Sequence, residues 1–293
     1  MKIIGLFINS INSVKNLKWN LLNNKFFFQF FFNCVKDYSL AIFNIKKNYS
    51  NQILDNKKLS QFKKSETVVI FGSGSSLNKI KDDDWNKIKE FDSIGFNSTI
   101  FLKKIHFTFH INREMVTQNI GEISNQINKI NENNFLDNTI FLMPKGFTAS
   151  YTNRIFRYKY WNKKKLFFLF NTNILLKEPF GNLQTGLIHK IGTLSDAMSF
   201  AYYMGYKRII LAGVDLIDRR YFFVPDDKTT NLLGIPTNID INGKKVEDTH
   251  QTALNGIVEL VERWKFFFNK RGVKLYLLNE KSLLRKYLKI FNF

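Results

Sequence analysis

From residue 67 onward, short runs of β-branched and aromatic residues alternate with longer segments that repeat apolar side chains at helical spacing. The runs predict strands at 67–71, 93–96, 105–111, 139–143, 208–214 and 273–278. The longer segments predict helices at 77–90, 113–130, 193–204, 251–269 and 281–290. Strands that alternate with helices are typical of a parallel sheet covered on both faces. We therefore expect an α/β fold: one Rossmann-like domain.

Residues 1–65 follow a different pattern, with the apolar clusters "KIIGLFI" and "KFFFQFFFNCVKDYSLAIF" set between lysines. Lys36 and Asp37 interrupt the second cluster, so neither cluster reaches the ~18 uncharged apolar residues of a membrane-spanning helix. No small-residue cleavage site of a secretory signal follows. Two interpretations remain open: an amphipathic element on an anionic membrane surface, or phenylalanines that cover the back of the main domain. We expect a basic amphipathic extension at 1–65 and a main domain at 66–293.

The chain is basic throughout, with 44 Lys and Arg against 24 Asp and Glu and a net charge of +20 over 293 residues. Such a charge favours polyanionic partners: nucleic acid, an anionic membrane or a phosphorylated ligand. Lys, Asn, Ile and Phe are abundant together, as an AT-rich genome produces, so coding bias is an equal explanation. The lysines are dispersed and no nucleic-acid recognition motif with interleaved aromatics is present. We therefore expect no nucleic-acid partner.

Cysteine and histidine give no metal-binding pattern. Cys34 is the single cysteine, which excludes an intramolecular disulfide and a cysteine zinc site and fits a reducing, cytoplasmic compartment. His106 and His110 fall on one predicted strand, where residues four apart are separated by about 13 Å, too far to share a metal ion. The acidic "DDDW" at 82–85 is interpreted as the charged start of a helix. We expect no metal site.

The turn "GSGSS" at 72–76 follows the first predicted strand and precedes a helix. Its backbone N–H groups and the helix N-terminus can hold a phosphate. The Gly-Lys-Ser/Thr ending of a P-loop is missing, and Leu77 stands where the dinucleotide fingerprint needs a third glycine. Asp92 lies at the start of the next strand, the wrong end to reach a ribose. The turn therefore predicts a nucleotide other than NAD or a P-loop triphosphate, or simply a tight corner.

Polar residues follow several of the predicted strands. Asn97, Asn112 and Asp215 stand where strands end, and the carboxyl ends of parallel strands are where open sheets bind ligands. A turn residue that satisfies the local backbone is the alternative for each asparagine. His250 stands at the start of a helix, after a long loop at 226–249 that we interpret as a lid. It can exchange protons near neutral pH as a general base, or be only a surface or capping residue.

Three segments, taken in their order along the chain, carry a family resemblance: "FGSGSSLNKI", "GYKRIILAGVDL" and the stretch from "THQTA" to "KLYLLNEKSLL". They resemble the bacterial sialyltransferases of glycosyltransferase family 42. These enzymes transfer sialic acid from CMP-sialic acid to a sugar acceptor. The resemblance runs from about Val68 to Leu284. It implies a GT-A-like variant of the Rossmann-like domain, and an enzyme that needs no cofactor beyond its donor substrate.

The resemblance assigns the donor-binding residues. The family turn that contacts the nucleotide matches Gly72, Ser73, Gly74 and Ser76. The asparagines that contact donor phosphate and nucleotide match Asn97 and Asn112. The segment that binds cytidine and the sugar carboxylate is similar to "KIGTLSDAM", which adds Lys190, Gly192 and Thr193. Asp215, at the same expected edge, completes the set.

The resemblance also implies the catalytic residues. His250 falls on the general base, and Tyr221 resembles one of two tyrosines that hydrogen-bond the departing phosphate. Ile217 stands at the other tyrosine position and cannot donate a hydrogen bond. Lys190 stands where an arginine is usual, which removes the planar fork suited to carboxylates. These departures leave the acidic sugar open: sialic acid, another nonulosonate or Kdo.

The expected activity is inverting, metal-independent transfer of a CMP-activated acidic sugar to a glycan, as in lipooligosaccharide or capsule biosynthesis. The expected place is the cytoplasmic side of the inner membrane, bound peripherally to its anionic surface, and a homo-oligomer is left open. A magnesium-dependent nucleotide phosphotransferase or pyrophosphokinase with a similar glycine turn is the rival enzyme class. A basic membrane or nucleic-acid binding module is the non-enzymatic alternative.

Overall fold

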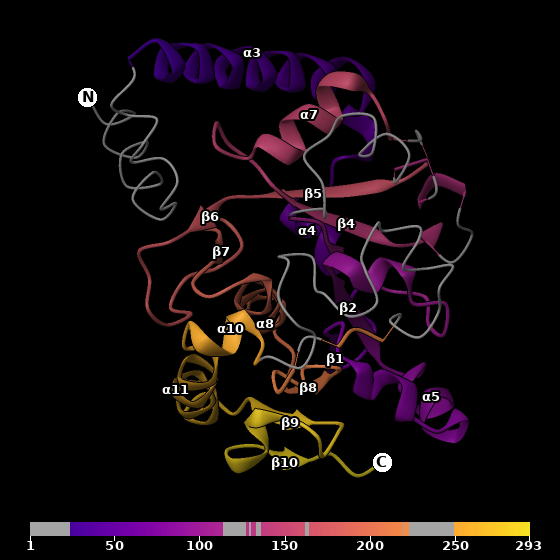
Figure 1. The fold of residues 1–293 in the computed structure, drawn as a ribbon. Coiled ribbons are helices and arrows are strands. Elements are labelled where there is room, and N and C mark those ends of the chain that lie inside the picture. The colour runs from indigo at the N-terminus through magenta and orange to yellow at the C-terminus, as the bar shows by residue number, and fades with distance from the viewer. Residues whose placement is uncertain are drawn as a thin grey trace.

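A computed structural model describes residues 24–113, 127–128, 130–132, 136–161, 164–218, 220–222 and 249–293. Within these residues an eight-stranded parallel sheet has the order β10-β9-β8-β1-β2-β3-β4-β5 (Figure 1). Its strands are β1 Thr67–Phe71, β2 Asp92–Phe96, β3 Phe109–Ile111, β4 Ile140–Pro144, β5 Leu166–Phe170, β8 Arg208–Ala212, β9 Lys274–Leu277 and β10 Lys289–Ile290. A small parallel pair joins β6 Thr172–Asn173 to β7 Leu187–Ile188. The expected α/β, Rossmann-like fold is confirmed.

The helices lie on both faces of this sheet. They are α3 Asn24–Asn48, α4 Asn56–Ser60, α5 Asp82–Ile88, α7 Ser150–Tyr158, α8 Thr193–Tyr203, α10 Gln251–Leu254 and α11 Ile257–Asn269. Short 3₁₀ turns cover Ser50–Gln52, Ser75–Lys79, Asn97–Phe101 and Leu283–Lys286. In the part of the chain that the structure describes, no helix combines the length and the apolar character that crossing a membrane requires.

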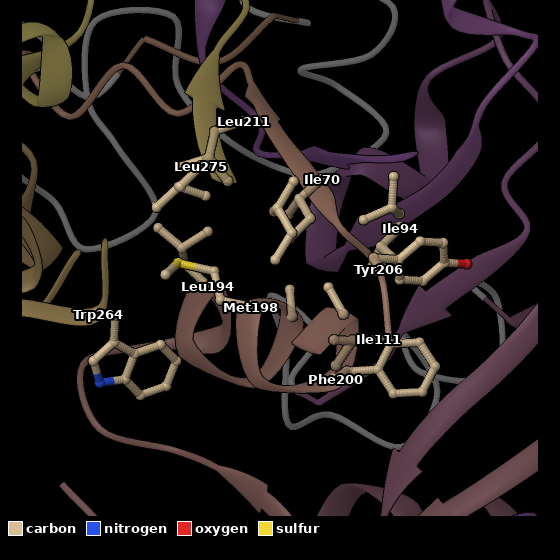
Figure 2. Packing of buried hydrophobic residues seen from close by; sticks show 14 of the residues in the cluster. Ile70, Ile94, Ile111, Leu194, Met198, Phe200, Tyr206, Leu211, Trp264 and Leu275 are labelled. Carbon is tan, nitrogen blue, oxygen red and sulfur yellow. The ribbon is translucent and has the colours of Figure 1, made fainter. Parts of the chain in front are cut away.

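The core has two layers because side chains on a strand alternate between faces. On β1, Val68 and Ile70 join a cluster with α8 and α11, whereas Val69 and Phe71 join a second cluster with α5. Figure 2 shows Ile70 above Leu194 and Met198 of α8 in the first layer. Polar residues follow the carboxyl ends of several strands, among them Asn97 after β2, Asn112 after β3 and Asp215 after β8.

Helix α3 lies along α7 at the β5 edge of the sheet (Figure 1). Asn44 Nδ2 donates to the carbonyls of Phe156 and Arg157, at 3.1 and 2.9 Å, and Asp37 pairs with Arg157. After the helix, Leu59 is fully buried in the first core layer. The segment predicted as an extension therefore supplies part of the domain's own core.

All six predicted strands are present, with shifted ends, and 105–111 is shortened to β3. The helix predicted at 281–290 is wrong, because the chain forms a 3₁₀ turn and then β10 there. The helix predicted at 251–269 is divided into α10 and α11, because Gly256 between them has a left-handed φ of 93°. Most of the helix predicted at 113–130 and nearly all of the loop predicted at 226–249 lie outside the described residues.

Candidate functional site

The site lies at the carboxyl ends of β1, β2, β3 and β8. From β1 the chain builds the sheet outward through β2 to β5, and it then returns to place β8 on the other side of β1. The order therefore reverses between β1 and β8, which is where open parallel sheets bind ligands. The loops that follow these two strands, 72–76 and 213–218, face each other at this point.

The glycine turn uses its own N–H groups for packing. Gly72 and Gly74 donate to the carbonyls of Ala212 and Gly213, both at 2.8 Å. Ser75 donates to the carbonyl of Arg220 at 3.1 Å, and Ser76 to Asp215 Oδ2 at 2.9 Å. Four of the five residues in the turn therefore have their N–H groups bonded within the protein. Among the described residues Ser73 alone keeps an N–H without such an acceptor, and the contact of Gly72, Gly74 and Ser76 with a donor stays a prediction.

Asp215 closes the turn. Its carboxylate is buried and accepts both the N–H and the hydroxyl of Ser76. Burial raises the pKa of this carboxyl, and the two hydrogen bonds from Ser76 oppose that rise. Each oxygen of Asp215 accepts one hydrogen bond from Ser76, so Asp215 positions the turn, and its contact with a donor stays a prediction.

Asn97 and Thr193 come together as the sequence predicts. Asn97 follows β2 with a φ of 51°, a left-handed conformation that asparagine tolerates better than most residues. Its Nδ2 donates to Thr193 Oγ1 at 3.2 Å. The Oδ1 atom is buried and has no hydrogen-bond partner among the described residues. Asn97 can therefore accept a hydrogen bond from a ligand through Oδ1, while one of the two Nδ2 hydrogens is bonded to Thr193.

Asn112 ends β3 and is fully buried. Its N–H donates to the carbonyl of Leu142, but neither Oδ1 nor Nδ2 has a partner of normal geometry within the described structure. The amide faces the buried hydroxyl of Tyr151; burial raises the pKa of that phenol and Asn112 lowers it in part. An unmet buried amide costs about 1–3 kcal/mol, so three such atoms on two neighbouring strands indicate a ligand.

The segment before α8 holds two more predicted residues. Gly192, with a φ of 88°, precedes α8, and a Cβ added there would lie 3.4 Å from Thr252 Cγ2. The start of α10 therefore lies against the Gly192 turn. The ammonium of Lys190 donates to the carbonyl of Ile174, and burial lowers its pKa, with Lys177 adding to the effect. Lys190 is thus directed toward the backbone of the β6–β7 loop.

His250 and Tyr221 lie at two sides of the site. His250 precedes α10, and its Nδ1 accepts the N–H of Thr252 at 3.2 Å, so it caps the helix. Tyr221 forms an antiparallel bridge with Gly74, and the next residue, Phe222, donates its N–H to the Ser73 carbonyl. Tyr221 therefore lies beside the glycine turn, and its contact with a departing phosphate stays a prediction.

Sequence reasoning missed a charged network at the same edge. The Asp196 carboxylate, with no exposed surface, lies 2.6 Å from His189 Nδ1 and 3.1 Å from an Arg113 guanidinium nitrogen. Arg113 also donates to Thr172 Oγ1 at 3.1 Å. Arg113 and Asp196 are 83 residues apart, so no local motif connects them. The one available signal was that Arg113 directly follows Asn112.

Within the described ranges, no group of three or more His, Cys, Asp or Glu side chains could hold a metal ion. No protein-family model matches the chain, and no curated protein matches it at a significant level.

Proposed function

We propose that this protein is an inverting glycosyltransferase that moves an acidic sugar from a CMP-activated donor to a hydroxyl of a glycan. The observation that carries the proposal is the set of buried, unpartnered amide atoms of Asn97 and Asn112 at the point where the strand order reverses. A nucleotide sugar offers the groups that these atoms lack. Its ribose and cytosine donate to an oxygen, and its phosphate accepts from a nitrogen.

The chemistry of each amide refines the assignment. The buried Oδ1 of Asn97 has no partner among the described residues, so it suits a hydroxyl or amino group of the donor. The Asn112 amide faces the Tyr151 hydroxyl without a hydrogen bond of normal geometry, and its Nδ2 suits the phosphate. With the Ser73 N–H and the hydroxyl of Tyr221, it would stabilise the charge that develops on departing CMP, at a few kcal/mol per well-placed donor.

In the proposed reaction the acceptor oxygen attacks the anomeric carbon as the bond from that carbon to the phosphate oxygen breaks. A histidine accepts the hydroxyl proton, and CMP leaves with the bonding electrons. The anomeric configuration is inverted. A monophosphate leaving group carries less charge than a diphosphate, so we propose turnover without a metal ion.

Binding of CMP tests the proposal without knowledge of the sugar. At about 100 times its Kd, a ligand stabilises the folded chain by roughly 2.7 kcal/mol, which raises Tm by several degrees in a domain of this size. We expect such a shift with CMP in EDTA. We expect Asn112→Leu to abolish the shift without lowering the Tm of the free chain, because the substitution removes two unmet polar atoms.

Asn86→Ala is the control, because Asn86 is exposed on α5, and CMP should raise its Tm as much as that of wild type. CDP, UDP, ATP and NAD are measured beside CMP. An absent CMP shift, or an ATP shift that appears only with magnesium, would overturn the proposal, and the second result would favour a phosphotransferase.

We also propose that the protein binds the anionic cytoplasmic surface of a membrane through the outer face of α3. The inner face of this helix, which includes Asp37, Ala41 and Asn44, is buried on the domain. The outer face exposes Phe32 and Phe43, 65% and 57% accessible, among lysines. These lysines are Lys36, Lys46 and Lys47. Exposed aromatics between cations are typical of helices that lie in the headgroup region.

The double variant Phe32→Ser, Phe43→Ser is expected to lower partitioning onto vesicles containing anionic phosphatidylglycerol by about tenfold or more, since inserted aromatic area is lost. Sedimentation with vesicles measures it. Phe266→Ser is the matched control, because Phe266 is 69% exposed on α11, away from α3. Deletion of 1–65 is unsuitable, since it also removes buried Tyr49 and Leu59. Equal binding of the double variant and wild type would refute the membrane proposal.

A further inference from the structure

The orientation of His250 decides which of its nitrogens carries the proton. Thr252 donates its N–H to Nδ1, so Nδ1 offers its lone pair there. A neutral imidazole has a single N–H, which must then be on Nε2. In this arrangement Nε2 is a hydrogen-bond donor and has no lone pair with which to take a proton from an acceptor hydroxyl.

His189 has the opposite arrangement. Its Nδ1 lies 2.6 Å from Asp196 Oδ2, while Arg113 donates to Oδ1 of the same carboxylate. A carboxylate that is paired with a guanidinium is ionised and can only accept hydrogen bonds. The proton of His189 is therefore on Nδ1, and Nε2 has a free lone pair. This is the relation by which an aspartate orients a basic histidine in hydrolases.

The surroundings of His189 fit a reacting group. The carboxylate of Asp196 is fully buried, the Arg113 side chain is 13% exposed and the His189 side chain is 26% exposed. The imidazole is thus more exposed to solvent than either of its orienting groups. The other neighbouring cation, Lys190, is bonded to the Ile174 carbonyl.

The network also lies at the proposed donor site. Arg113 directly follows Asn112. Asp196 stands one helical turn after Thr193, the residue to which Asn97 donates. His189 precedes the Gly192 turn, whose other side lies against the start of α10. The two histidines therefore flank the same turn.

We propose that His189 is the general base of the transfer and that Asp196 and Arg113 position it; this rests on the glycosyltransferase function proposed above. The proton of the acceptor hydroxyl passes to His189 Nε2 as the acceptor oxygen bonds to the anomeric carbon. The carbon–oxygen bond to the phosphate breaks, and its electron pair leaves with CMP.

The test compares His189→Gln with His250→Gln in the full chain, with CMP-sialic acid and CMP-Kdo as probe donors and a mixed oligosaccharide acceptor. We expect His189→Gln to lower kcat about 10²–10⁴-fold, to remove the acid limb of the pH profile of kcat/KM, and to leave the CMP thermal shift unchanged. We expect His250→Gln to lower kcat but to keep that acid limb. Asp196→Asn should lower kcat and also alter the acid limb of the pH profile. A merely structural role of Asp196 would leave that limb unchanged.

A measurement on the wild type keeps the assignment testable if a variant fails to fold. Nitrogen-15 NMR of the imidazoles reads the tautomers without substrate, and we expect Nδ1–H at His189 and Nε2–H at His250 at neutral pH. The reverse pattern, or an acid limb lost in His250→Gln and kept in His189→Gln, overturns the assignment of the base alone. A wild type that shows neither a CMP shift nor transfer overturns the proposed function, and the base assignment with it.

Discussion

Lowering the pH from 7 to 5 is expected to destabilise the folded chain by about 2 kcal/mol through one side chain, His110. This histidine lies on β3 with no exposed surface, between the rings of Phe107 and Phe141. Its one polar contact among the described residues joins Nε2 to Thr99 Oγ1 at 3.3 Å. Burial lowers the pKa of His110 from 6.5 to about 3, because the cation would lose its water.

The sign of the effect follows from which state binds the proton. Between about pH 6.5 and 3 the unfolded chain protonates His110 and the folded chain does not. The contribution to stability is therefore complete above pH 6.5 and is lost as the pH falls through this window. Each unit of pH within the window costs about 1.4 kcal/mol.

Urea denaturation at pH 7 and pH 5 measures the loss. We expect His110→Gln, which cannot titrate, to lose less stability between these pH values than wild type, whatever its stability at pH 7. His106→Gln is the control, because His106 is exposed four residues earlier. If His110→Gln keeps the full loss of wild type, other groups cause the acid sensitivity.

The strand pattern predicted the fold because inner strands such as β1 carry apolar residues on both faces. Val68, Val69, Ile70 and Phe71 are all fully buried, so a continuous β-branched and aromatic run was enough to identify β1. The predicted place of Asp92, at the start of its strand, is also confirmed. It lies at the amino end of β2, where it accepts the N–H groups of 64 and 65 and the hydroxyl of Tyr206. Its role there is to join the starts of the strands.

The site was predictable in its location and not in its contacts. The family resemblance added Thr193 to the site. The sequence itself placed Asn97 and Asn112 at one edge, because strand ends in a parallel sheet converge. It could not show that the N–H groups of the glycine turn bond to a loop about 140 residues later, since that contact depends on β8 returning beside β1. For the same reason, no spacing reveals that Asp196 joins His189 to Arg113.

Gly72→Ala is expected to lower the free energy of unfolding by about 1–3 kcal/mol or more in the absence of any ligand. A Cβ at Gly72 would lie 2.5 Å from the carbonyl oxygen of Gly213, closer than real Cβ atoms come to other atoms, and 3.1 Å from the carbonyl carbon. Gly213 cannot move easily. Its N–H donates to Asn279 Oδ1, its φ is 65°, and its carbonyl accepts the N–H of Gly74.

Thermal and urea denaturation of the ligand-free chain measure this loss, with Ser73→Ala as the control in the same turn. If the glycines were there only to let a phosphate approach, Gly72→Ala would leave the free chain as stable as wild type and would weaken only the binding of CMP. The contacts predict instead that the ligand-free Gly72→Ala chain is less stable than wild type. Stability falls first, because the two loops that follow β1 and β8 must touch before Asn97 and Asn112 can form a site beside them. A stable Gly72→Ala that has lost the CMP shift would restore the phosphate-binding role to the turn.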